Sequence, residues 1–199
     1  TWEIIQENLK KANYEVFFKV IDAVHWVPQH RKRIFIVGFD KQQFDTKRDN
    51  FFQFPNEPNT ELKISSILQK RVPDKYTLKD GTWNSLQTIK TRNQNLPKGQ
   101  KKGFGYSLVD RKAPSRTLTK RYFKDGAEIL IPQKNKNPRK LSPIEALRLM
   151  GFNAIEDRFS TKEEVFTVSD GQAFRQLGNA VVPEIVEEIG REILRTIEK

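Results

Sequence analysis

Cysteine is absent from this chain of 199 residues, and histidine occurs only at His25 and His30. The chain therefore cannot form a disulfide, a thiolate zinc site or a cysteine nucleophile, and a histidine-rich metal site is excluded as well. No apolar run approaches the roughly 18 residues of a membrane span, and the first residues lack the apolar stretch of a signal peptide. These absences predict a cytoplasmic protein with no metal site and no membrane segment.

The first residue is threonine rather than methionine, and the opening TWEIIQENLKK is typical of the interior of a longer protein. We therefore expect a fragment or one subunit of a larger assembly. Hydrophobic residues make up 36% of the chain and charged residues 31%, which predicts a true core under a heavily charged surface rather than disorder. The length allows one large domain or two small ones.

The positive charge is concentrated in the middle of the chain. Residues 61–124 hold sixteen basic and four acidic side chains, whereas residues 1–60 and 125–199 are close to neutral. A basic segment alone is as often a solvated surface as a binding site, but here aromatic residues alternate with the charges. Because each phosphate that a cation neutralises releases counterions, this pattern favours a nucleic acid partner. Charge does not separate RNA from DNA.

The beginning of the chain predicts an α/β arrangement. Residues 2–12 place apolar side chains on one helical stripe, and YEVFFKVI at 14–21 is rich in strand-forming residues. RIFIVGF at 33–39 is almost wholly apolar, which is typical of a buried strand in a parallel sheet. Residues 41–60 are polar and Phe-rich with two prolines, which indicates a linker. Residues 61–133 are broken by Gly, Pro and Asn and predict small strands and loops rather than long helices.

Two helices near the end carry clear signals. Ser142-Pro143-Ile144-Glu145 is a capping box with proline at the first helical position, and Gly151 predicts the end of that helix. A second helix is expected from Pro183 to the end of the chain. Its apolar stripe repeats isoleucine at every fourth position from 185 to 197, which is the pattern of core packing.

Two further motifs could carry chemistry. VPQHRKR at 27–33 directly precedes a predicted strand and is either an ordinary basic turn or a pair of guanidinium forks. In the second case Arg31 and Arg33 would face one side, toward an anion or a base carbonyl. QAFRQLGNAVVP at 172–183 places the turn signal Gly178-Asn179 before a helix. It is either an ordinary loop and cap or a place where the backbone approaches a ligand closely.

Together these motifs resemble those of one enzyme family. VPQHRKRIFIVG at 27–38 resembles the VPQxRxRxFIVG signature of the DNA cytosine-5 methyltransferases, and RKLSPIEALRLMGF at 139–152 resembles their RxLTPxExxRLxGF stretch. QLGNAV at 176–181 is similar to their final QxGN[SA]V motif, and RTLT at 116–119 to the short motif that closes their target recognition region. The resemblance covers essentially the whole chain. It implies methyl transfer from S-adenosylmethionine to C5 of a cytosine in double-stranded DNA.

The middle of the chain resembles a narrower group. KGFGY at 102–106 and SRTLTKRYFKDGAEILI at 115–131 are similar to bacterial enzymes that methylate CC(W/N)GG or CCGG sites. The resemblance therefore implies a short target of the CC-N-GG or CCGG kind and a setting in restriction–modification.

Several parts of the family's machinery are missing. The cofactor-binding FxGxG loop, the Pro-Cys nucleophile loop and the Glu-Asn-Val motif all precede the QxRxR motif in the family, and none is present here. The resemblance thus implies the C-terminal half of an enzyme, with edge elements of a Rossmann-like sheet and a small mixed target recognition domain rich in strands and loops. Residues 1–40 resemble the last elements of the catalytic domain, and residues 41–165 the recognition domain. Residues 166–199 resemble the cofactor-side motif and C-terminal helix that pack back on the catalytic domain.

The resemblance also implies residue roles. C5 and C6 of cytosine are unreachable inside a duplex, so the base must leave the stack. Arg33 would contact O2 of the flipped cytosine and stabilise charge developing on the ring, while Arg31 would brace the site or touch a phosphate. Gln29 completes the expected catalytic set, and Asn179, Ala180 and Val181 are expected to line the cofactor pocket.

DNA contacts are expected from the basic middle segment. Which of its side chains touch bases rather than phosphates is not decided by the sequence. The expected contact residues are Lys101, Lys102, Arg116, Lys120, Arg121, Tyr122 and Lys124.

Two alternatives stay open besides a fragment of a methyltransferase. One is a non-catalytic DNA-binding module, and the other is one subunit of a split methyltransferase whose partner carries the missing half. In each case we expect no methyl transfer from this chain alone, because it contains no cysteine.

Overall fold

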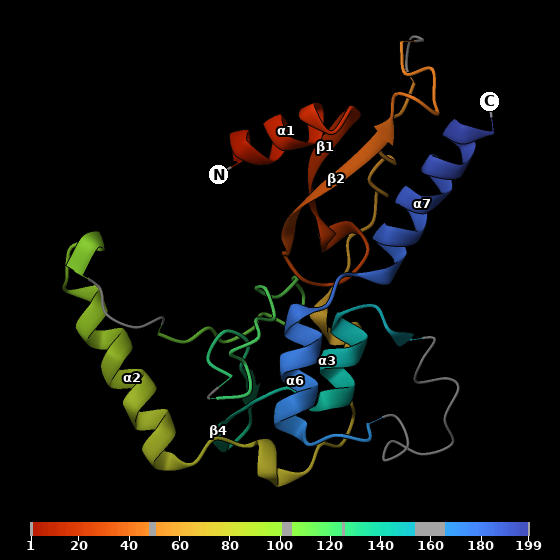
Figure 1. The fold of residues 1–199 in the computed structure, drawn as a ribbon. Coiled ribbons are helices and arrows are strands. Elements are labelled where there is room, and N and C mark those ends of the chain that lie inside the picture. The colour runs from red at the N-terminus through yellow and green to blue at the C-terminus, as the bar shows by residue number, and fades with distance from the viewer. Residues whose placement is uncertain (1, 48–50, 101–104, 125, 154–165, 199) are drawn as a thin grey trace.

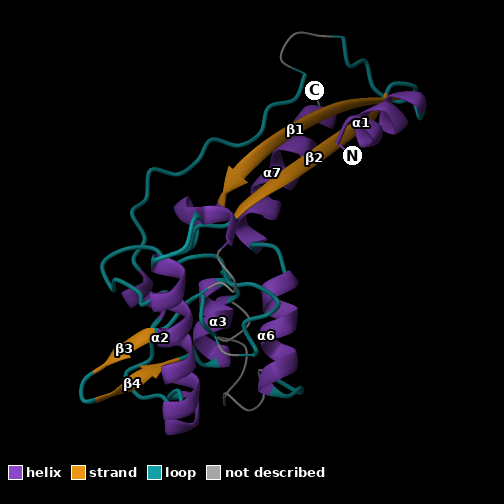
Figure 2. Ribbon diagram, turned by 90° about the vertical axis from the view of Figure 1, so that its left-hand side faces the viewer, coloured by secondary structure: helices purple, strands orange, loops and turns teal. Residues whose placement is uncertain are grey.

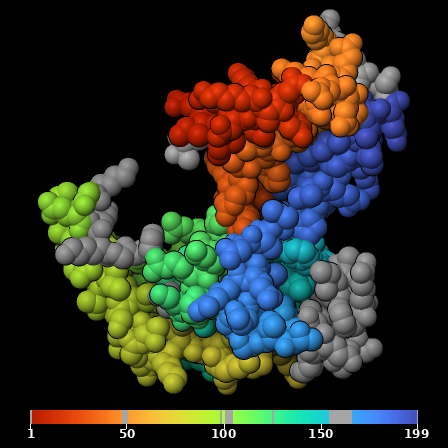
Figure 3. Space-filling model, viewed as in Figure 1, coloured from red at the N-terminus to blue at the C-terminus, as the bar shows by residue number. Residues whose placement is uncertain are grey.

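The computed structural model describes residues 2–47, 51–100, 105–124, 126–153 and 166–198, and they form two lobes joined by a narrow waist (Figures 1 and 3). The upper lobe of Figure 1 contains a two-stranded sheet, and the lower lobe is mainly helical with a short hairpin. Buried apolar side chains nevertheless form one continuous cluster that includes Ile21 and Val37 of the sheet and Leu118 and Phe174 of the lower lobe. The two lobes therefore share one hydrophobic core. No helix among the described residues is long and apolar enough to cross a membrane.

The sheet of the upper lobe is an antiparallel pair. β1 (Tyr14–Asp22) and β2 (Lys32–Asp40) pair in continuous register from Tyr14 opposite Asp40 to Asp22 opposite Lys32. The two strands form where the sequence predicts them, but the expectation of a buried parallel strand at 33–39 was wrong. The cause is the connection between them, which is too short for a parallel crossover and holds only the 3₁₀ helix η1 (Ala23–His25) and a turn.

The two faces of this sheet differ in what covers them. Phe17, Val37 and Phe39 point to the inner face and pack with Phe51 and Phe52, which are 7% and 5% exposed. The predicted linker therefore has no helix or strand at 51–60, but it is part of the core rather than a solvated connection. Its phenylalanines supply the apolar area that the inner face needs.

The outer face of the sheet stays largely uncovered by the described residues. Phe18 opposite Ile36 and Val20 opposite Ile34 are between 39% and 59% exposed. Only α1 (Trp2–Lys11) lies against this face, through the ring of Trp2 at 4.7 Å from the ring of Phe18. Four apolar side chains side by side on one face mark a surface that is normally buried against another element.

The C-terminal helix α7 (Pro183–Ile197) runs beside the sheet (Figures 1 and 2). It begins at Pro183, as predicted, and its isoleucine stripe is buried at Ile185 and Ile189. The end of the stripe is exposed, because Ile197 is 42% accessible. The stripe thus packs on the core as far as the partly buried Ile193, and only its last isoleucine is exposed.

The lower lobe is built around two packed helices, α3 (Pro143–Leu149) and α6 (Asp170–Asn179). α3 starts with the predicted capping box, since the Ser142 hydroxyl accepts a bond from the Glu145 amide while the Glu145 carboxylate accepts one from the Ser142 amide. Gly151 ends this helix region at a φ of 81°, a conformation that favours glycine. The predictions for α3 are confirmed.

The remaining elements of the lower lobe are short apart from one. β3 (Ile131–Gln133) and β4 (Lys136–Arg139) form a hairpin, and 3₁₀ turns occur at η2 (Ile64–Ile67), η3 (Asp74–Tyr76) and η4 (Lys98–Gln100).

The long element is α2 (Asp80–Gln94), and it contradicts the expectation that residues 61–133 contain no long helix. α2 stands at the side of the lobe and buries only Leu86, so it lacks the apolar stripe by which helices are detected in a sequence. It also contains Gly81 and several residues of low helix propensity.

Candidate functional site

The waist is formed by the turn between β1 and β2, which lies against a segment far away in the sequence. The Ser115 amide donates to the Pro28 carbonyl at 2.8 Å, and the His30 amide donates back to the Ser115 carbonyl at 2.9 Å. The Thr117 hydroxyl adds a bond to the His30 carbonyl at 2.6 Å. These main-chain bonds join two of the recognised motifs, 27–33 and 116–119, into one short parallel contact.

Gln29 is completely buried at this contact. Its Nε2 donates to the Leu149 carbonyl at 2.8 Å and lies 3.2 Å from the Met150 sulfur, and its Oε1 accepts from the Leu118 amide at 3.1 Å. The expectation that Gln29 is catalytic was wrong, because both ends of its amide bind the protein itself. Gln29 ties the turn to α3 and to the 116–119 segment.

Arg31 is 3% exposed and binds three main-chain oxygens. Nη1 donates to the Leu118 carbonyl at 2.8 Å, and Nη2 donates to the carbonyls of Gly178 at 3.0 Å and Ala180 at 2.7 Å. Gly178 and Ala180 lie at the C-terminal end of α6, where carbonyls have no intrahelical partner and the helix dipole is negative. Arg31 therefore caps α6 and braces the waist, and its fork is not available to a phosphate.

The positive charge of Arg31 persists in this buried position. Burial, with a smaller contribution from the charge of Arg33, lowers the pKa of Arg31 to about 10, so the side chain remains protonated at neutral pH. The described residues supply carbonyl dipoles rather than a carboxylate as its partners. Such a buried cation is stabilised only while all of these acceptors stay in place.

The Asp22 carboxylate binds the same turn through His30 and Arg31. Its Oδ1 accepts from the Arg31 amide at 2.8 Å, and its Oδ2 lies 3.1 Å from Nδ1 of His30. Burial alone raises the pKa of the Asp22 carboxyl, but the bonds from His30 and from the Arg31 amide outweigh it, so the pKa lies below its ordinary value. The carboxylate thus fixes the conformation of the QHR segment at neutral pH.

Arg33 behaves differently from Arg31. It is exposed, and its Nη1 donates to the neighbouring Lys32 carbonyl at 2.7 Å. Arg31 and Arg33 therefore do not face one side as a pair of guanidinium groups open to a ligand. The Arg31 guanidinium binds carbonyls of the protein, and the Arg33 guanidinium is exposed at the waist.

The residues expected to contact DNA also include both exposed and buried side chains. Arg116, Lys120, Arg121 and Lys124 are exposed around the waist. Lys101 and Lys102 lie outside the described residues.

Tyr122 is completely buried, and the expectation that it contacts DNA was wrong. Its hydroxyl donates to the Ile129 carbonyl at 2.8 Å and accepts from the Leu141 amide at 2.7 Å. Burial is the main cause that raises the pKa of this hydroxyl above its ordinary value. Tyr122 therefore anchors the 115–124 segment in the core.

One cation at the same surface was missed by the sequence analysis. Arg175 of α6 is exposed, and its guanidinium lies 4.1 Å from the centre of the Phe123 ring. An arginine stacked on an aromatic ring is held in one orientation while its edge stays free to donate hydrogen bonds. Arg175 belongs to the FRQLGN motif at 174–179, but its ring partner Phe123 is distant in sequence, so the motif alone does not indicate the stacking.

The third motif meets the other two through Gly178. A Cβ at this position would lie less than 3.0 Å from backbone atoms of Thr119 and Lys120, so α6 touches the 116–120 segment main chain to main chain. Beyond it, Asn179 and Val181 are exposed, the latter by 51%, and Ala180 is half-buried. The exposed apolar Val181 thus lies directly after a turn that Arg31 fixes.

The stretch 139–152 acts as a structural clamp. The Arg139 guanidinium binds the Glu145 carboxylate through two bonds of 2.7 and 2.9 Å, and Glu145 is completely buried. The same carboxylate accepts from the amides of Ser142 and Gln69. A buried pair with this many bonds fixes the geometry of α3, whose end carries the Leu149 carbonyl that binds Gln29.

The fold defined by these elements is that of methyltransferases. The S. pombe Dnmt2 methyltransferase superposes with a TM-score of 0.70 over 99% of this chain and 61% of that chain, at 16% identity. The Entamoeba histolytica methyltransferase EhMeth superposes with a TM-score of 0.67 over 100% of this chain and 58% of that chain, at 19% identity. At such identities the likeness establishes the fold alone.

The chain belongs to the C-5 cytosine-specific DNA methylase family, whose model matches residues 1–195. The Type II methyltransferase M.SsoII of Shigella sonnei is 40% identical over 100% of this chain and 49% of its own length. The Type II methyltransferase M1.ScrFI of Lactococcus lactis subsp. cremoris is 39% identical over 100% of this chain and 48% of its own length. The chain therefore spans about half the length of the curated relatives it matches. The family resemblance drawn from the motifs is confirmed.

Family membership implies S-adenosylmethionine as the methyl donor. The turn after α6 fits such a ligand on one side only. Asn179 presents an accessible amide and Val181 an accessible apolar surface, while Arg31 holds the Ala180 carbonyl between them. The donor, acceptor and apolar surface of this turn are thus compatible with such a ligand.

Proposed function

We propose that this chain is the C-terminal, target-recognising half of a DNA cytosine-5 methyltransferase and that it acts together with a segment carrying the cysteine nucleophile. The observation that carries the proposal is the convergence of three separated motifs at the waist. Gln29 and Arg31 bind Leu118 from one side, and Arg31 binds the end of α6 from the other. This arrangement holds the turn that carries the exposed Arg33 against the 115–119 segment, whose neighbours Lys120 and Arg121 are exposed cations.

The need for a complementary segment is supported by two independent features. The chain contains no cysteine, so it cannot supply the nucleophile that attacks C6. The outer face of the β1–β2 sheet exposes Phe18, Val20, Ile34 and Ile36 to an extent that is normal only for a surface that another element covers. We expect the strands and helices of the missing catalytic half to cover this face.

Arg33 is the residue on this chain with the most direct role in the chemistry. The target base must leave the duplex before C5 and C6 become accessible. An accessible guanidinium at the lip of the waist suits the O2 atom of the flipped cytosine, where it would stabilise negative charge that develops during attack. Arg31 acts as a positioning residue, because it holds the turn that carries Arg33.

The cofactor contact is proposed at the turn after α6. When bound, S-adenosylmethionine supplies the methyl group. Asn179 would donate to or accept from the polar part of the ligand, and Val181 would cover an apolar part of it.

Target recognition is assigned to the exposed cations around the waist: Arg116, Lys120, Arg121, Lys124 and Arg175. We propose a CC-N-GG or CCGG site on the similarity of residues 102–131 to enzymes of that group. A double-stranded partner is supported by the charge of residues 61–124, because phosphate contacts dominate the affinity of proteins for DNA.

A complementation assay tests the proposal. Labelled methyl incorporation into CCWGG, CCGG and scrambled duplexes is measured with this chain alone and after addition of the part of the Shigella sonnei relative that the chain does not match. We expect incorporation only in the mixture and only at one of the two sites. Arg33→Ala should abolish it, whereas Arg191→Ala, which removes an exposed ion pair of α7, should not. Incorporation by the chain alone, or no incorporation by any mixture, would contradict the proposal.

A further inference from the structure

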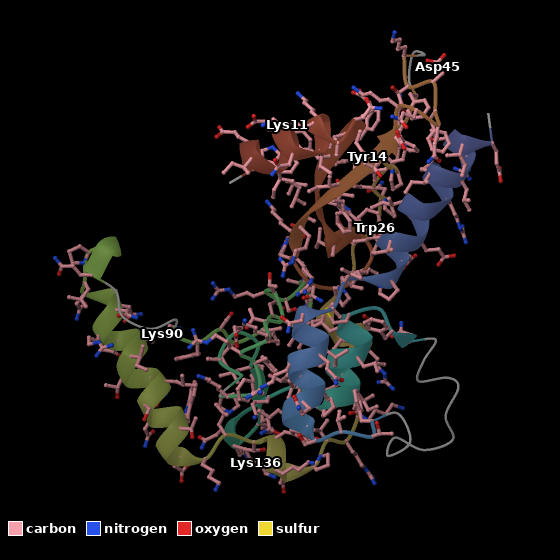
Figure 4. All side chains as sticks on the ribbon, in the orientation of Figure 1. Lys11, Tyr14, Trp26, Asp45, Lys90 and Lys136 are labelled. Carbon is pink, nitrogen blue, oxygen red and sulfur yellow. The ribbon has the colours of Figure 1, made fainter. Side chains whose placement is uncertain are left out.

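Helix α2 is attached to the lower lobe by one stripe of side chains. The ring of Trp83 lies 4.7 Å from the ring of Tyr106, and the Lys90 ammonium lies 4.3 Å from the centre of the same ring. Leu86, between them on the helix, is buried in a small cluster with Leu130. Figure 4 shows Lys90 on the side of α2 that faces the centre of the lobe. The attachment fixes which face of α2 points outward.

The outward stripe has an unusual composition. Its members are spaced three and four residues apart, are exposed, and line a shallow depression on the helix: Asn84, Gln87, Thr88, Thr91 and Arg92. Amides, hydroxyls and one guanidinium are thus presented together. The sequence contains no acidic residue from Gly81 to Val109, so nothing in this stretch repels a phosphate.

The other exposed helices show what a purely solvated face looks like in this protein. On α1, Lys11 pairs with Glu7 at 2.8 Å, and on α7, Arg191 pairs with Glu187 at 2.6 Å. Acid–base pairs of this spacing stabilise exposed helices. The outward stripe of α2 instead carries uncharged polar residues at four of its five positions, with Arg92 as the fifth.

That replacement makes α2 a weaker helix. Asn and Thr have lower helix propensity than the Glu, Lys and Ala that usually occupy exposed helical positions. Positions 84, 88 and 91 are exposed, so packing does not demand these residues either. A binding role explains why the stripe departs from what helix stability favours.

We infer that the outward stripe of α2 reads the edges of base pairs flanking the methylated site. This inference rests on the proposed function. The major groove of DNA admits an α-helix, and its base edges match these side chains: Asn and Gln pair with adenine, Arg pairs with guanine, and the Thr methyl contacts the thymine methyl. A helix of 15 residues is about 22 Å long, enough to follow several base pairs.

The position of α2 suits a flanking contact rather than a contact with the target base. α2 stands apart from the waist, and the surface between its C-terminal end and the upper lobe is hollowed (Figure 3). A duplex whose target cytosine lies at Arg33 would extend past the waist on both sides. We assign to α2 the base pairs on one side.

The test uses the whole chain and two duplexes with the same central target. One duplex ends at the target site, and the other extends by about 10 base pairs on each side, further than α2 can reach. The variant is Asn84→Ala/Thr88→Ala/Thr91→Ala, and the control is Thr82→Ala, at an exposed position of α2 off the stripe. Alanine is the best helix former, so the triple variant keeps or strengthens the helix.

We expect the triple variant to bind the extended duplex at least about tenfold more weakly than the parent chain, with unchanged binding to the short duplex. The control should match the parent chain on both duplexes. Equal affinity of the triple variant and the parent for the extended duplex, or equal losses on both duplexes, would overturn the inference while leaving the proposed function intact. Failure of the parent chain to bind either duplex would remove the proposed function itself, and the inference with it.

Discussion

Two glycines inside helices allow a direct test of the close backbone contact between α6 and the 116–120 segment at the waist. Gly178 of α6 and Gly190 of α7 both adopt ordinary helical backbone, but their surroundings differ. A Cβ at Gly190 would meet no atom within 4 Å, whereas a Cβ at Gly178 would overlap backbone atoms of Thr119 and Lys120. Both substitutions add one methyl group. Gly178→Ala places it in a main-chain contact, whereas Gly190→Ala places it in open space.

The magnitudes follow from these two environments. Alanine stabilises a helix by up to about 1 kcal/mol relative to glycine, and this gain is available at both positions. At Gly178 the added methyl must also push apart two segments of backbone, for which overpacking costs about 1–3 kcal/mol. Gly190→Ala should thus be as stable as the parent chain or more so, and Gly178→Ala should fall below Gly190→Ala by about 1–3 kcal/mol.

Urea denaturation followed by tryptophan fluorescence measures the difference, since three tryptophans report on the chain. Gly178→Ala should also weaken DNA binding, because it displaces the backbone that carries Lys120. Equal stabilisation by both substitutions would show that α6 and the 116–120 segment separate without cost and would refute the account of the waist.

Three further outcomes are expected. Tyr122→Phe should lower the free energy of unfolding by about 1–3 kcal/mol, because it leaves a buried amide and a buried carbonyl unpaired, and a change below about 0.5 kcal/mol in urea titrations would contradict this. Arg116→Ala should weaken DNA binding and make its salt dependence shallower if the side chain contacts phosphate, while Glu187→Ala should change neither in titrations at two salt concentrations. Burial raises the pKa of Asp170, but bonds from Lys75 and Tyr76 lower it below 3.8 overall. The stability that these bonds contribute is therefore fully present above the ordinary carboxyl pKa and is lost as the pH falls through the lower pKa of Asp170 in the folded state. Asp170→Asn should thus make the melting temperature fall less steeply with decreasing pH in this acidic range.

The elements with local signals were predictable from the sequence. The capping box at Ser142, the helix start at Pro183 and the positions of both strands needed only neighbouring residues. The strand partner was not predictable in the same way, because an apolar run indicates burial without indicating direction. α2 escaped detection because only Leu86 of its fifteen residues is buried.

The fate of each candidate site residue depended on distant partners. Arg31 is separated from its acceptors by 87, 147 and 149 positions, and no spacing rule shows that three carbonyls will surround it. Tyr122 was expected at the DNA because aromatic residues between cations are typical of nucleic acid contacts, yet its hydroxyl pairs inside the core. Lys120 and Arg121 of the same segment are exposed, and their contact with DNA stays a prediction.

The 116–120 segment is held largely through its main chain, beside the buried side chains of Leu118 and Tyr122. Gln29 binds the Leu118 amide, Arg31 binds the Leu118 carbonyl, and Gly178 lies against the backbone of Thr119 and Lys120. Peptide groups are the same for every residue type, so these main-chain contacts make few demands on the exposed side chains of Arg116, Lys120 and Arg121. Those exposed side chains can therefore be exchanged among relatives while the backbone contacts and the buried Leu118 and Tyr122 stay as they are, so the surface of this segment can vary without rebuilding the core beneath it.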